Sequence, residues 1–429
     1  MKTAKGRAAA RKPAPGALER VARREGLEPA ELRRLVRAGR VVLVRSRRRR
    51  NIEPLAIGEG TRVKVNANIG TSPDRCDLEQ ELAKLRAAVA AGADTVMDLS
   101  VGGDVDEVRR AVISESPVPV GTVPIYQVAL DARGRRRSWL EAKPREVLAG
   151  VEKHLADGVD FVTVHCGVTR RTVETLRRTG RVCGIVSRGG SMTAEWMKLN
   201  RRENPLYEYY DELLAMAKSY RAVLSIGDGL RPGALADATD EAQVAELLLI
   251  GELVERARAA GVQAMVEGPG HVPLDQVEAN VRLEKQVCAG APFYLLGPLV
   301  TDCAAGHDHI AGAIGGALAA WHGADFLCYV TPSEHLGLPG VEDVRLGVIA
   351  SRIAGHAADL ARRRPGAAAR DLRMSRARAA LDWPAMWKEA IDPERARSVF
   401  EASRSRTDGV CTMCGEFCAI KRTKETFDE

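Results

Sequence analysis

What this chain of 429 residues lacks limits what it can be. It has no run of eighteen apolar residues, and no apolar stretch follows the basic residues at its N-terminus, so we predict neither a membrane span nor a secretory signal. Its nine cysteines are an odd number and most stand alone, which argues against a disulfide framework. We therefore expect a cytoplasmic protein in a reducing compartment.

Aromatic side chains are also scarce, at 4% of the chain, and this bears on its formal charge of +7. Much of the excess charge lies in residues 1–50, which end in Arg45-Ser-Arg-Arg-Arg-Arg50. Basic side chains without interleaved aromatics more often form a solvated face or phosphate contacts than a specific RNA-binding surface. We do not expect a nucleic-acid partner. A non-catalytic nucleotide or RNA binder is the alternative from another functional class.

From Val63 onward, short apolar runs alternate with longer amphipathic segments, as in repeated β-α units around a parallel sheet. No run is followed by a Gly-x-Gly-x-x-Gly turn, which favours an eight-stranded β/α barrel over an open doubly wound sheet. One more segment qualifies as a strand than the barrel can hold, so one is expected outside it. The candidates are residues 63–69, 95–100, 118–125, 161–166, 182–187, 223–227, 262–267, 292–296 and 325–330.

The chain divides into four regions around this barrel. Residues 1–60 form a basic N-terminal arm, which begins without periodicity over 1–16 and continues as a small helical segment over 17–38. The catalytic barrel spans 61–340, a helical cover and connection spans 341–403, and a cluster-binding tail spans 404–429.

Polar side chains stand at the end of almost every expected strand, where a barrel enzyme builds its active site. Arg188 and Arg231 offer forked donors, and Ser187 with the glycines after it offers the small-residue cradle that a phosphate needs. Tyr126 and Tyr294 supply apolar walls. These ends therefore predict a phosphorylated, nucleotide-like substrate.

Two histidines at strand ends, His271 and His335, are candidate ligands of a divalent metal, with zinc as the default. Two ligands make an incomplete site, so each histidine could instead only donate a hydrogen bond to the substrate. His307 and His309 form a rival pair, which we rank lower because they open a helix.

Three thiols, Cys411, Cys414 and Cys418, crowd into one short stretch near the C-terminus. Three thiolates and one open position suit a [4Fe-4S] cluster with an unligated iron. A zinc knuckle with a distant fourth ligand, or thiols without a partner, would use the same pattern. No acid–base or two-metal constellation stands out at the strand ends, so an open cluster beside a phosphorylated substrate favours reductive cleavage of S-adenosylmethionine.

Long motifs run from Val63 to Cys418, among them Lys64-Val-Asn-Ala-Asn-Ile-Gly70, Glu267-Gly-Pro-Gly-His-Val-Pro273 and Cys328-Tyr-Val-Thr-Pro332. They resemble the phosphomethylpyrimidine synthases of thiamine biosynthesis, which are radical S-adenosylmethionine lyases. The resemblance implies conversion of 5-aminoimidazole ribotide to 4-amino-5-hydroxymethyl-2-methylpyrimidine phosphate, with release of formate and carbon monoxide. It also implies an external electron donor and a homodimer in which one subunit's cluster tail serves the other's barrel.

The same resemblance implies roles for individual residues. His271 and His335 match the metal ligands, and Cys411, Cys414 and Cys418 match the cluster ligands that make the catalytic centre. The positions that match substrate-binding residues are Asn68, Met97, Tyr126, His165, Ser187, Arg188, Gly189, Asp228, Gly229, Leu230, Arg231, Glu267 and Tyr294.

Three features depart from the family pattern. Only Gly415-Glu-Phe417 separate the second and third cysteines of the tail, and the segment 42–50 replaces an Ile-Pro-Ala-Asn-like stretch. Near the site, Ser100-Val101 and Cys166-Gly167 replace the expected threonine and alanine. Such neighbours can redirect a radical intermediate, so a relative that acts on the same substrate, the 5-hydroxybenzimidazole synthase of anaerobic cobamide biosynthesis, is the alternative enzyme.

Overall fold

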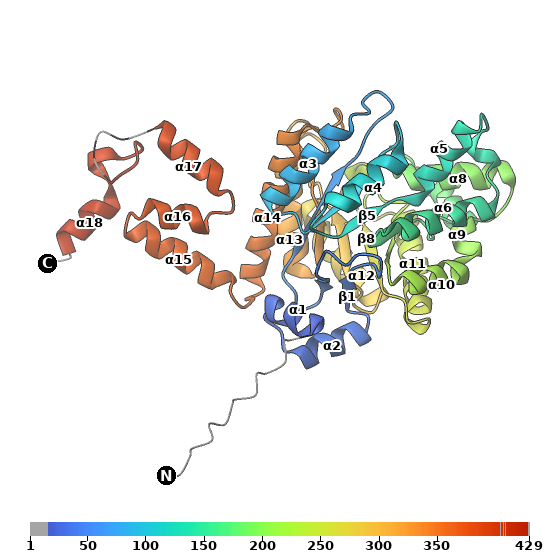
Figure 1. Cartoon of the computed structure of the whole chain (residues 1–429), viewed down its shortest axis with the longest axis horizontal. Helices are drawn as coiled ribbons and strands as arrows, with labels where there is room; N and C mark the ends of the chain where they lie inside the picture. The colour runs from blue at the N-terminus through green and yellow to red at the C-terminus, as the bar shows by residue number, and fades with distance from the viewer. Residues whose placement is uncertain (1–15, 404, 406, 408, 428–429) are drawn as a thin grey trace, which may run out of the picture.

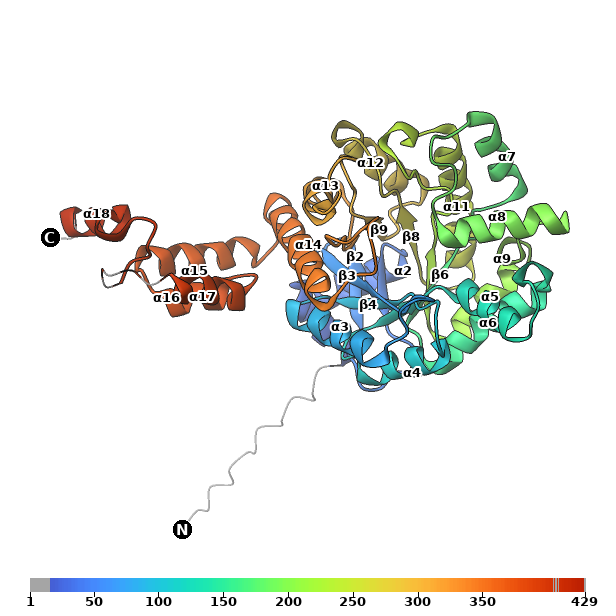
Figure 2. The same cartoon turned by 90° about the horizontal axis from the view of Figure 1, so that it is seen from above.

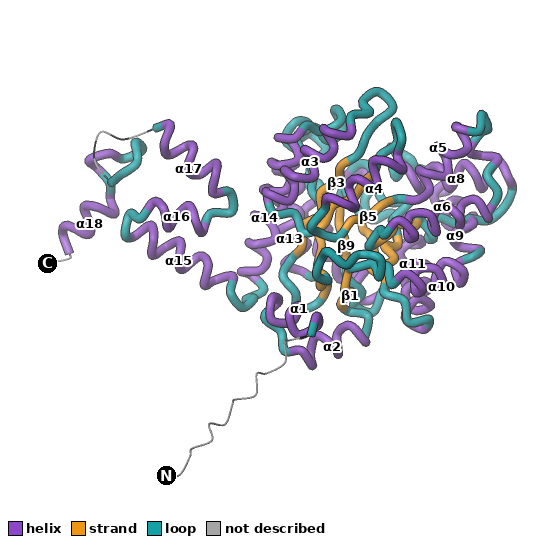
Figure 3. Tube along the Cα trace, in the orientation of Figure 1, coloured by secondary structure: helices purple, strands orange, loops and turns teal. Residues whose placement is uncertain are grey.

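The computed structural model describes residues 16–403, 405, 407 and 409–427. The stretch 1–16, which we predict to lack structure, lies outside the described residues except for Gly16. A closed barrel of parallel strands forms the centre of the molecule, in the order β10-β3-β4-β5-β6-β7-β8-β9, which confirms the predicted fold class (Figures 1 and 3). The strands are β3 (Lys64–Ile69), β4 (Thr95–Asp98), β5 (Val120–Thr122), β6 (Phe161–Val164), β7 (Val223–Ile226), β8 (Ala264–Gly268), β9 (Phe293–Leu296) and β10 (Phe326–Cys328).

A layer of helices surrounds the strands (Figure 3). Alternate side chains of each strand face this layer or the barrel interior. On β6, for example, Val162 and Val164 pack with the helices, whereas the ring of Phe161 points inward and meets Phe326 edge-on, with 6.4 Å between centroids. The helices are α3 (Leu78–Ala91), α4 (Val105–Glu115), α5 (Pro124–Gly134), α6 (Pro144–Asp157), α7 (Arg170–Thr179), α8 (Arg188–Asn200), α9 (Pro205–Glu208), α10 (Tyr210–Tyr220), α11 (Glu241–Ala259), α12 (Val277–Val287), α13 (Asp308–His322) and α14 (Val341–Ala361).

The surplus strand candidate is the segment 182–187, which forms no strand and leads into α8 instead. Two of its apolar side chains face solvent, since Val182 is 77% and Val186 42% exposed, whereas Ile185 packs against Trp196 and its neighbours. The backbone amides of Val182 and Cys183 donate to the carboxylate of Asp237, at 2.8 and 2.9 Å, rather than to a neighbouring strand. The expectation that one candidate lies outside the barrel is therefore correct.

The N-terminal region closes the end of the barrel opposite the strand ends that carry the polar residues. Helices α1 (Ala17–Glu25) and α2 (Pro29–Arg37) are followed by a hairpin that the sequence did not predict, β1 (Val41–Val44) and β2 (Leu55–Gly58). Side chains of the hairpin, including Val44 and Ile57, pack with Phe161 inside the barrel.

The arginine run after β1 serves this closure. Arg49 is almost fully buried, its Nη1 lies 3.4 Å from a carboxylate oxygen of Asp160, and its Nη2 donates to the carbonyl oxygen of Ser116 at 2.7 Å. Arg47 donates to the carbonyl oxygen of Ser219 at 2.6 Å. Both arginines therefore help to fasten the N-terminal arm to the barrel, although Arg47 is exposed.

The C-terminal region projects away from the barrel (Figures 1 and 2). It comprises α15 (Ala367–Ala379), α16 (Trp383–Glu389), α17 (Pro393–Ala402) and α18 (Ala419–Phe427), with the three clustered cysteines between α17 and α18. None of the helices among the described residues is long and apolar enough to cross a lipid bilayer.

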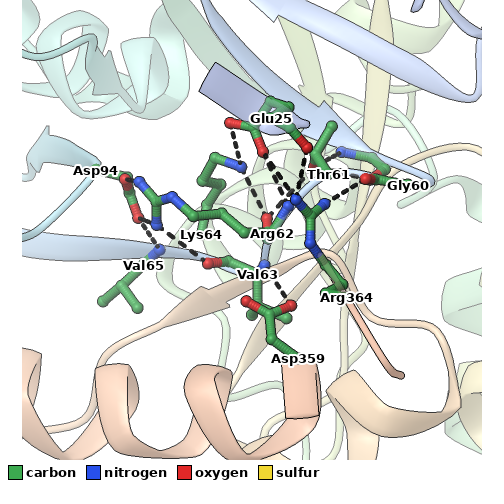
Figure 4. Close-up of polar contacts among 11 residues, drawn as sticks. Glu25, Gly60, Thr61, Arg62, Val63, Lys64, Val65, Asp94, Asp359 and Arg364 are labelled. Atoms are coloured by element: carbon green, nitrogen blue, oxygen red, sulfur yellow. Dashed lines mark hydrogen bonds and ion pairs between the residues drawn. The ribbon is translucent and has the colours of Figure 1, made fainter. Parts of the chain in front are cut away.

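Buried ion pairs tie the N-terminal arm to the barrel and to the start of this projecting region (Figure 4). Glu25, the last residue of α1, lies 3.1 Å from Nζ of Lys64, the first residue of β3, and both side chains are at most 1% exposed. Arg364, just beyond α14, donates to the carbonyl oxygen of Glu25 at 2.7 Å and to that of Gly60. Asp359 of α14 accepts from the amide of Val63 at 3.2 Å.

Candidate active site

A pocket of about 540 Å³ opens at the carboxyl ends of the barrel strands. It collects side chains from strands far apart in the sequence, as expected for the mouth of a β/α barrel. Of the predicted substrate-binding residues, those that line it are Asn68, Met97, Tyr126, His165, Ser187, Asp228, Arg231, Glu267 and Tyr294.

The other four predicted residues lie next to these rather than in the lining. The guanidinium of Arg188 stands 5.0 Å from the ring centroid of Tyr126, and Arg188 lines a neighbouring hollow with His335. Gly189 packs so closely on His165 that an added Cβ would lie 2.2 Å from the imidazole. Gly229 and Leu230 form the turn between Asp228 and Arg231.

The floor of the pocket is held by hydrogen bonds within the barrel. Thr163 and Ser225 each donate a hydroxyl to Oε1 of Glu267, at 2.7 Å, and burial raises the pKa of that carboxyl. The hydroxyl of Tyr294 lies 3.4 Å from the sulfur of Met97, and its ring stacks on Phe326 with 4.1 Å between centroids. These contacts fix the walls against which a ligand would bind.

Two buried polar atoms at the mouth lack a hydrogen-bond partner among the described residues, Nδ1 of His165 and Oδ2 of Asp228. Burial lowers the pKa of His165 to about 3, so the imidazole is neutral, and its Nε2 lies 3.1 Å from Oγ of Ser187. Burial raises the pKa of Asp228 to about 7, although Arg231, 3.1 Å away, opposes this shift. Because buried polar groups rarely stay unpaired, both atoms suit contacts with a bound polar ligand.

A close backbone approach shapes the arginine-bearing side of the mouth. Ser187 is the N-cap of α8, and its hydroxyl accepts from the amide of Gly190 at 3.1 Å. A Cβ at Gly190 would lie 2.3 Å from the carbonyl oxygen of Gly229, so only glycine fits there. This contact brings the turn with Arg231 against the start of α8, where the helix N-terminus and the guanidinium both favour an anion.

The two candidate metal-binding histidines lie side by side, with 5.2 Å between the ring centroids of His271 and His335. Nδ1 of His271 lies 2.8 Å from a carboxylate oxygen of Asp302, and Nδ1 of His335 lies 3.4 Å from one of Asp308. Metal-binding histidines commonly use one ring nitrogen on a carboxylate and the other on the ion. Both rings therefore keep Nε2 for a ligand.

The rival histidines form a less suitable pair. The ring centroids of His307 and His309 are 6.3 Å apart at the start of α13. Burial lowers the pKa of His309, and its Nδ1 has no hydrogen-bond partner within the part of the chain that the structure describes. Among the described residues, no carboxylate lies against Nδ1 of His309 in the way that Asp302 lies against Nδ1 of His271.

The three clustered cysteines lie on one turn and are free thiols. The amide of Gly415, whose φ is +50°, donates to the carbonyl oxygen of Cys411 at 3.1 Å, and the amide of Phe417 donates to that of Cys414 at 2.9 Å. Residues 16–403, 405, 407 and 409–427 contain no group of three or more His, Cys, Asp or Glu side chains already arranged around a metal ion. The three thiols therefore do not converge on one point in this structure, and their assignment as cluster ligands stays a prediction.

The fold and the site define a β/α-barrel enzyme with a polar pocket for a small molecule at its strand ends and a separate three-thiol tail. Residues 5–425 match the model of the radical SAM ThiC family. The chain is 57% identical over 409 residues to the phosphomethylpyrimidine synthase of Moorella thermoacetica, covering 95% of each chain. It is 56% identical to that of Geobacter metallireducens, covering 92% of this chain and 91% of the relative, and 54% identical to that of Methanopyrus kandleri, covering 98% of each.

The chain therefore belongs to the radical SAM ThiC family, as the motifs predicted. Membership implies S-adenosylmethionine and an iron–sulfur cluster as cofactors and a small-molecule substrate. Among solved structures, a dihydropteroate synthase from Thermus thermophilus aligns with 73% of this chain and 97% of its own, at 18% identity and a TM-score of 0.41. That similarity says nothing further about this chain.

The pocket also includes residues that the sequence did not single out as site residues. Cys328, at the end of β10, lines it, and Nδ2 of Asn68 lies 3.1 Å from its sulfur. Thr163 lines it as well, two residues before His165 and so on the same face of β6. The alternation of side chains along the strand could have identified Thr163 as a pocket residue. The position of Cys328 in a family motif could have done the same for its thiol.

Proposed function

We propose that this chain is a phosphomethylpyrimidine synthase, a lyase of thiamine biosynthesis that converts 5-aminoimidazole ribotide to 4-amino-5-hydroxymethyl-2-methylpyrimidine phosphate with release of formate and carbon monoxide. The observation that carries the proposal is the identity of 54–57%, over more than nine-tenths of the chain, with enzymes of that name. The pocket at the strand ends supports it, because its polar lining and its arginine suit a phosphorylated nucleoside-like ligand.

The residues at the mouth divide the work of binding the ribotide. Arg231 and the start of α8 would hold the phosphate. Nδ1 of His165 and Oδ2 of Asp228, which have no hydrogen-bond partner among the described residues, would form hydrogen bonds with polar groups of the ribose or the imidazole ring. Met97 and Tyr126 would exclude water from the imidazole. Each of these roles uses an atom that faces the pocket or has no protein partner.

The turn of Cys411, Cys414 and Cys418 would hold the [4Fe-4S] cluster. When bound, the cluster and S-adenosylmethionine supply the radical that starts the reaction, with electrons from an external donor. His271 and His335, whose Nδ1 atoms lie near carboxylates, would hold a divalent metal such as zinc beside the mouth.

A homodimer would bring the cluster to a barrel. The C-terminal region extends away from its own barrel, and Met413 and Phe417 on the cysteine turn are 89% and 67% exposed (Figures 1 and 2). Large apolar side chains presented in this way suit a contact with a second copy.

Mixed dimers would test this arrangement. Cys414→Ala removes the cluster of a subunit and Arg231→Met removes its substrate binding, so neither homodimer should turn over. If each tail serves the partner's barrel, an exchanged equimolar mixture should recover about a quarter of wild-type turnover, because half the dimers are mixed and each has one complete site. No recovery in dimers that have exchanged would place the tail on its own barrel.

Radical chemistry is tested with the reconstituted enzyme under anaerobic conditions. The ribotide should trigger formation of 5′-deoxyadenosine from S-adenosylmethionine. Cys414→Ala should abolish both this product and the iron–sulfur absorption. Cys303→Ala, which removes an exposed thiol outside the tail, is the matched control and should change neither. An intact absorption band in Cys414→Ala would overturn the cluster assignment.

A further inference from the structure

A carboxyl group lies buried directly behind the substrate pocket, without lining it. Glu246 belongs to α11 and is 2% exposed. Its Oε2 accepts a hydrogen bond of 2.7 Å from the backbone amide of Leu230. Leu230 stands between Asp228 and Arg231, whose side chains both reach the pocket.

Glu246 is also the point at which two site-bearing segments meet. A Cβ at Gly167 would lie 2.8 Å from Cγ of Glu246, and a Cβ at Gly229 would lie 3.3 Å from its Oε1. Gly167 follows His165 closely in the chain, and the carbonyl oxygen of Gly229 is the atom against which Gly190 packs. A change in Glu246 would therefore move the Asp228–Arg231 turn and its neighbours together, since packed interiors transmit small displacements.

We propose that Glu246 is a positioning residue for substrate binding, because its carboxyl fixes the Leu230 amide and thereby sets Asp228 and Arg231 at the pocket. The proposal rests on the proposed function for the identity of the substrate. It assigns Glu246 no contact with the ribotide.

The surroundings favour the neutral carboxyl. Burial raises the pKa of Glu246 to about 8, and the nearby charge of Asp228 raises it further, while the amides of Leu230 and Gly229 and the charge of Arg181 act in the opposite direction. Arg181 is itself paired with Asp240, at 2.6 Å. A glutamine, which is neutral and can accept the same hydrogen bond, should therefore replace Glu246 with little loss, whereas alanine should not.

The chain supplies a matched control in Glu284 of α12. This carboxyl is fully buried, burial likewise raises its pKa to about 8, and it does not line the pocket. Substitutions at Glu284 therefore measure how the loss of a buried carboxyl away from the pocket affects exchange and ribotide binding.

The experiment compares Glu246→Gln, Glu246→Ala, Glu284→Gln and Glu284→Ala in the full-length protein. Hydrogen exchange resolved at the Leu230 amide should be about tenfold faster in Glu246→Ala, and ribotide affinity by calorimetry should fall about tenfold, because a buried donor has lost its acceptor. Glu246→Gln should match wild type in both, and cluster content should be the same in all variants.

Unchanged exchange at Leu230 in Glu246→Ala would overturn the proposal, as would equal effects from Glu284→Ala. If Glu246→Ala does not fold, Glu246→Met, which keeps most of the side-chain volume and removes the acceptor, decides by the same exchange measurement, and unchanged exchange at Leu230 refutes the role. Failure of wild-type protein to bind the ribotide would instead refute the proposed function, while the exchange measurement would still decide the role of Glu246.

Discussion

Replacing Glu25 by alanine should destabilise the whole barrel, although the residue lies far from the active site. Its carboxylate faces Nζ of Lys64 at 3.1 Å and accepts from the amide of Arg62 at 2.9 Å (Figure 4). Arg364 lies 3.9 Å away. Removing the carboxylate leaves the amide of Arg62 without its acceptor and the buried ammonium of Lys64 without its counterion, although Nζ still donates to the carbonyl oxygen of Arg62 at 2.7 Å.

The size of the effect follows from this burial. Breaking a buried pair by removing one partner costs about 3–5 kcal/mol. With an unfolding entropy of about 2.1 cal/mol/K for each of about 400 residues, this loss corresponds to a melting temperature about 4–6 °C lower. Burial lowers the pKa of Lys64 to about 8 even though the charge of Glu25 raises it. Loss of Glu25 should therefore lower this pKa further. The unpaired lysine can then lose its proton at lower pH, so the difference from wild type should be largest below pH 7 and should narrow as pH rises through 8.

Differential scanning calorimetry between pH 6 and 9 measures this effect. Glu174→Ala, which removes an exposed carboxylate paired with Arg177 on α7, is the control and should leave the transition unchanged. The double variant Glu25→Leu/Lys64→Met should lose much less than the sum of its single variants, because no buried charge is left alone. A Glu25→Ala transition within error of wild type, or additive losses in the double variant, would refute the reasoning.

Three further results are expected. Gly190→Ala places a Cβ 2.3 Å from a backbone carbonyl oxygen and should weaken ribotide binding more than tenfold in calorimetry, with unchanged iron content. Arg49→Met leaves Asp160 buried without its cation; because burial raises the pKa of Asp160 to about 6, the fall in melting temperature should be larger at pH 8 than at pH 5, and the reverse order would contradict it. His335→Ala should lose the divalent metal, measured by elemental analysis, whereas His309→Ala should keep it; the opposite result would move the site to the rival pair.

The barrel and most of its mouth were predictable because both follow from local patterns. Alternating runs define the strands, and polar residues at their ends meet at one face whatever the details of packing. The segment 182–187 was ambiguous because an exposed apolar run held by the carboxylate of Asp237 has the same pattern as a short strand. The hairpin of β1 and β2 was missed because its arginine-rich loop resembles a solvated arm, and only the fold supplies the carboxylate of Asp160 that buries Arg49.

Residues that act through spatial neighbours gave no sequence signal. Glu246 lies within an amphipathic helix, where a glutamate is ordinary until the fold places the Leu230 amide against it. The geometry of the two histidines likewise depends on Asp302 and Asp308, which stand in other segments of the chain. Pattern identifies which residues reach the mouth, whereas the residues that orient them become visible only in three dimensions.

The most direct test of the central claim is the mass of the product. Reconstituted enzyme should be incubated anaerobically with a reductant, S-adenosylmethionine and 5-aminoimidazole ribotide, and the products separated and measured by mass spectrometry. We predict 4-amino-5-hydroxymethyl-2-methylpyrimidine phosphate together with formate and carbon monoxide. The mass of 5-hydroxybenzimidazole, or no conversion of the ribotide by protein with a full cluster, would contradict the account.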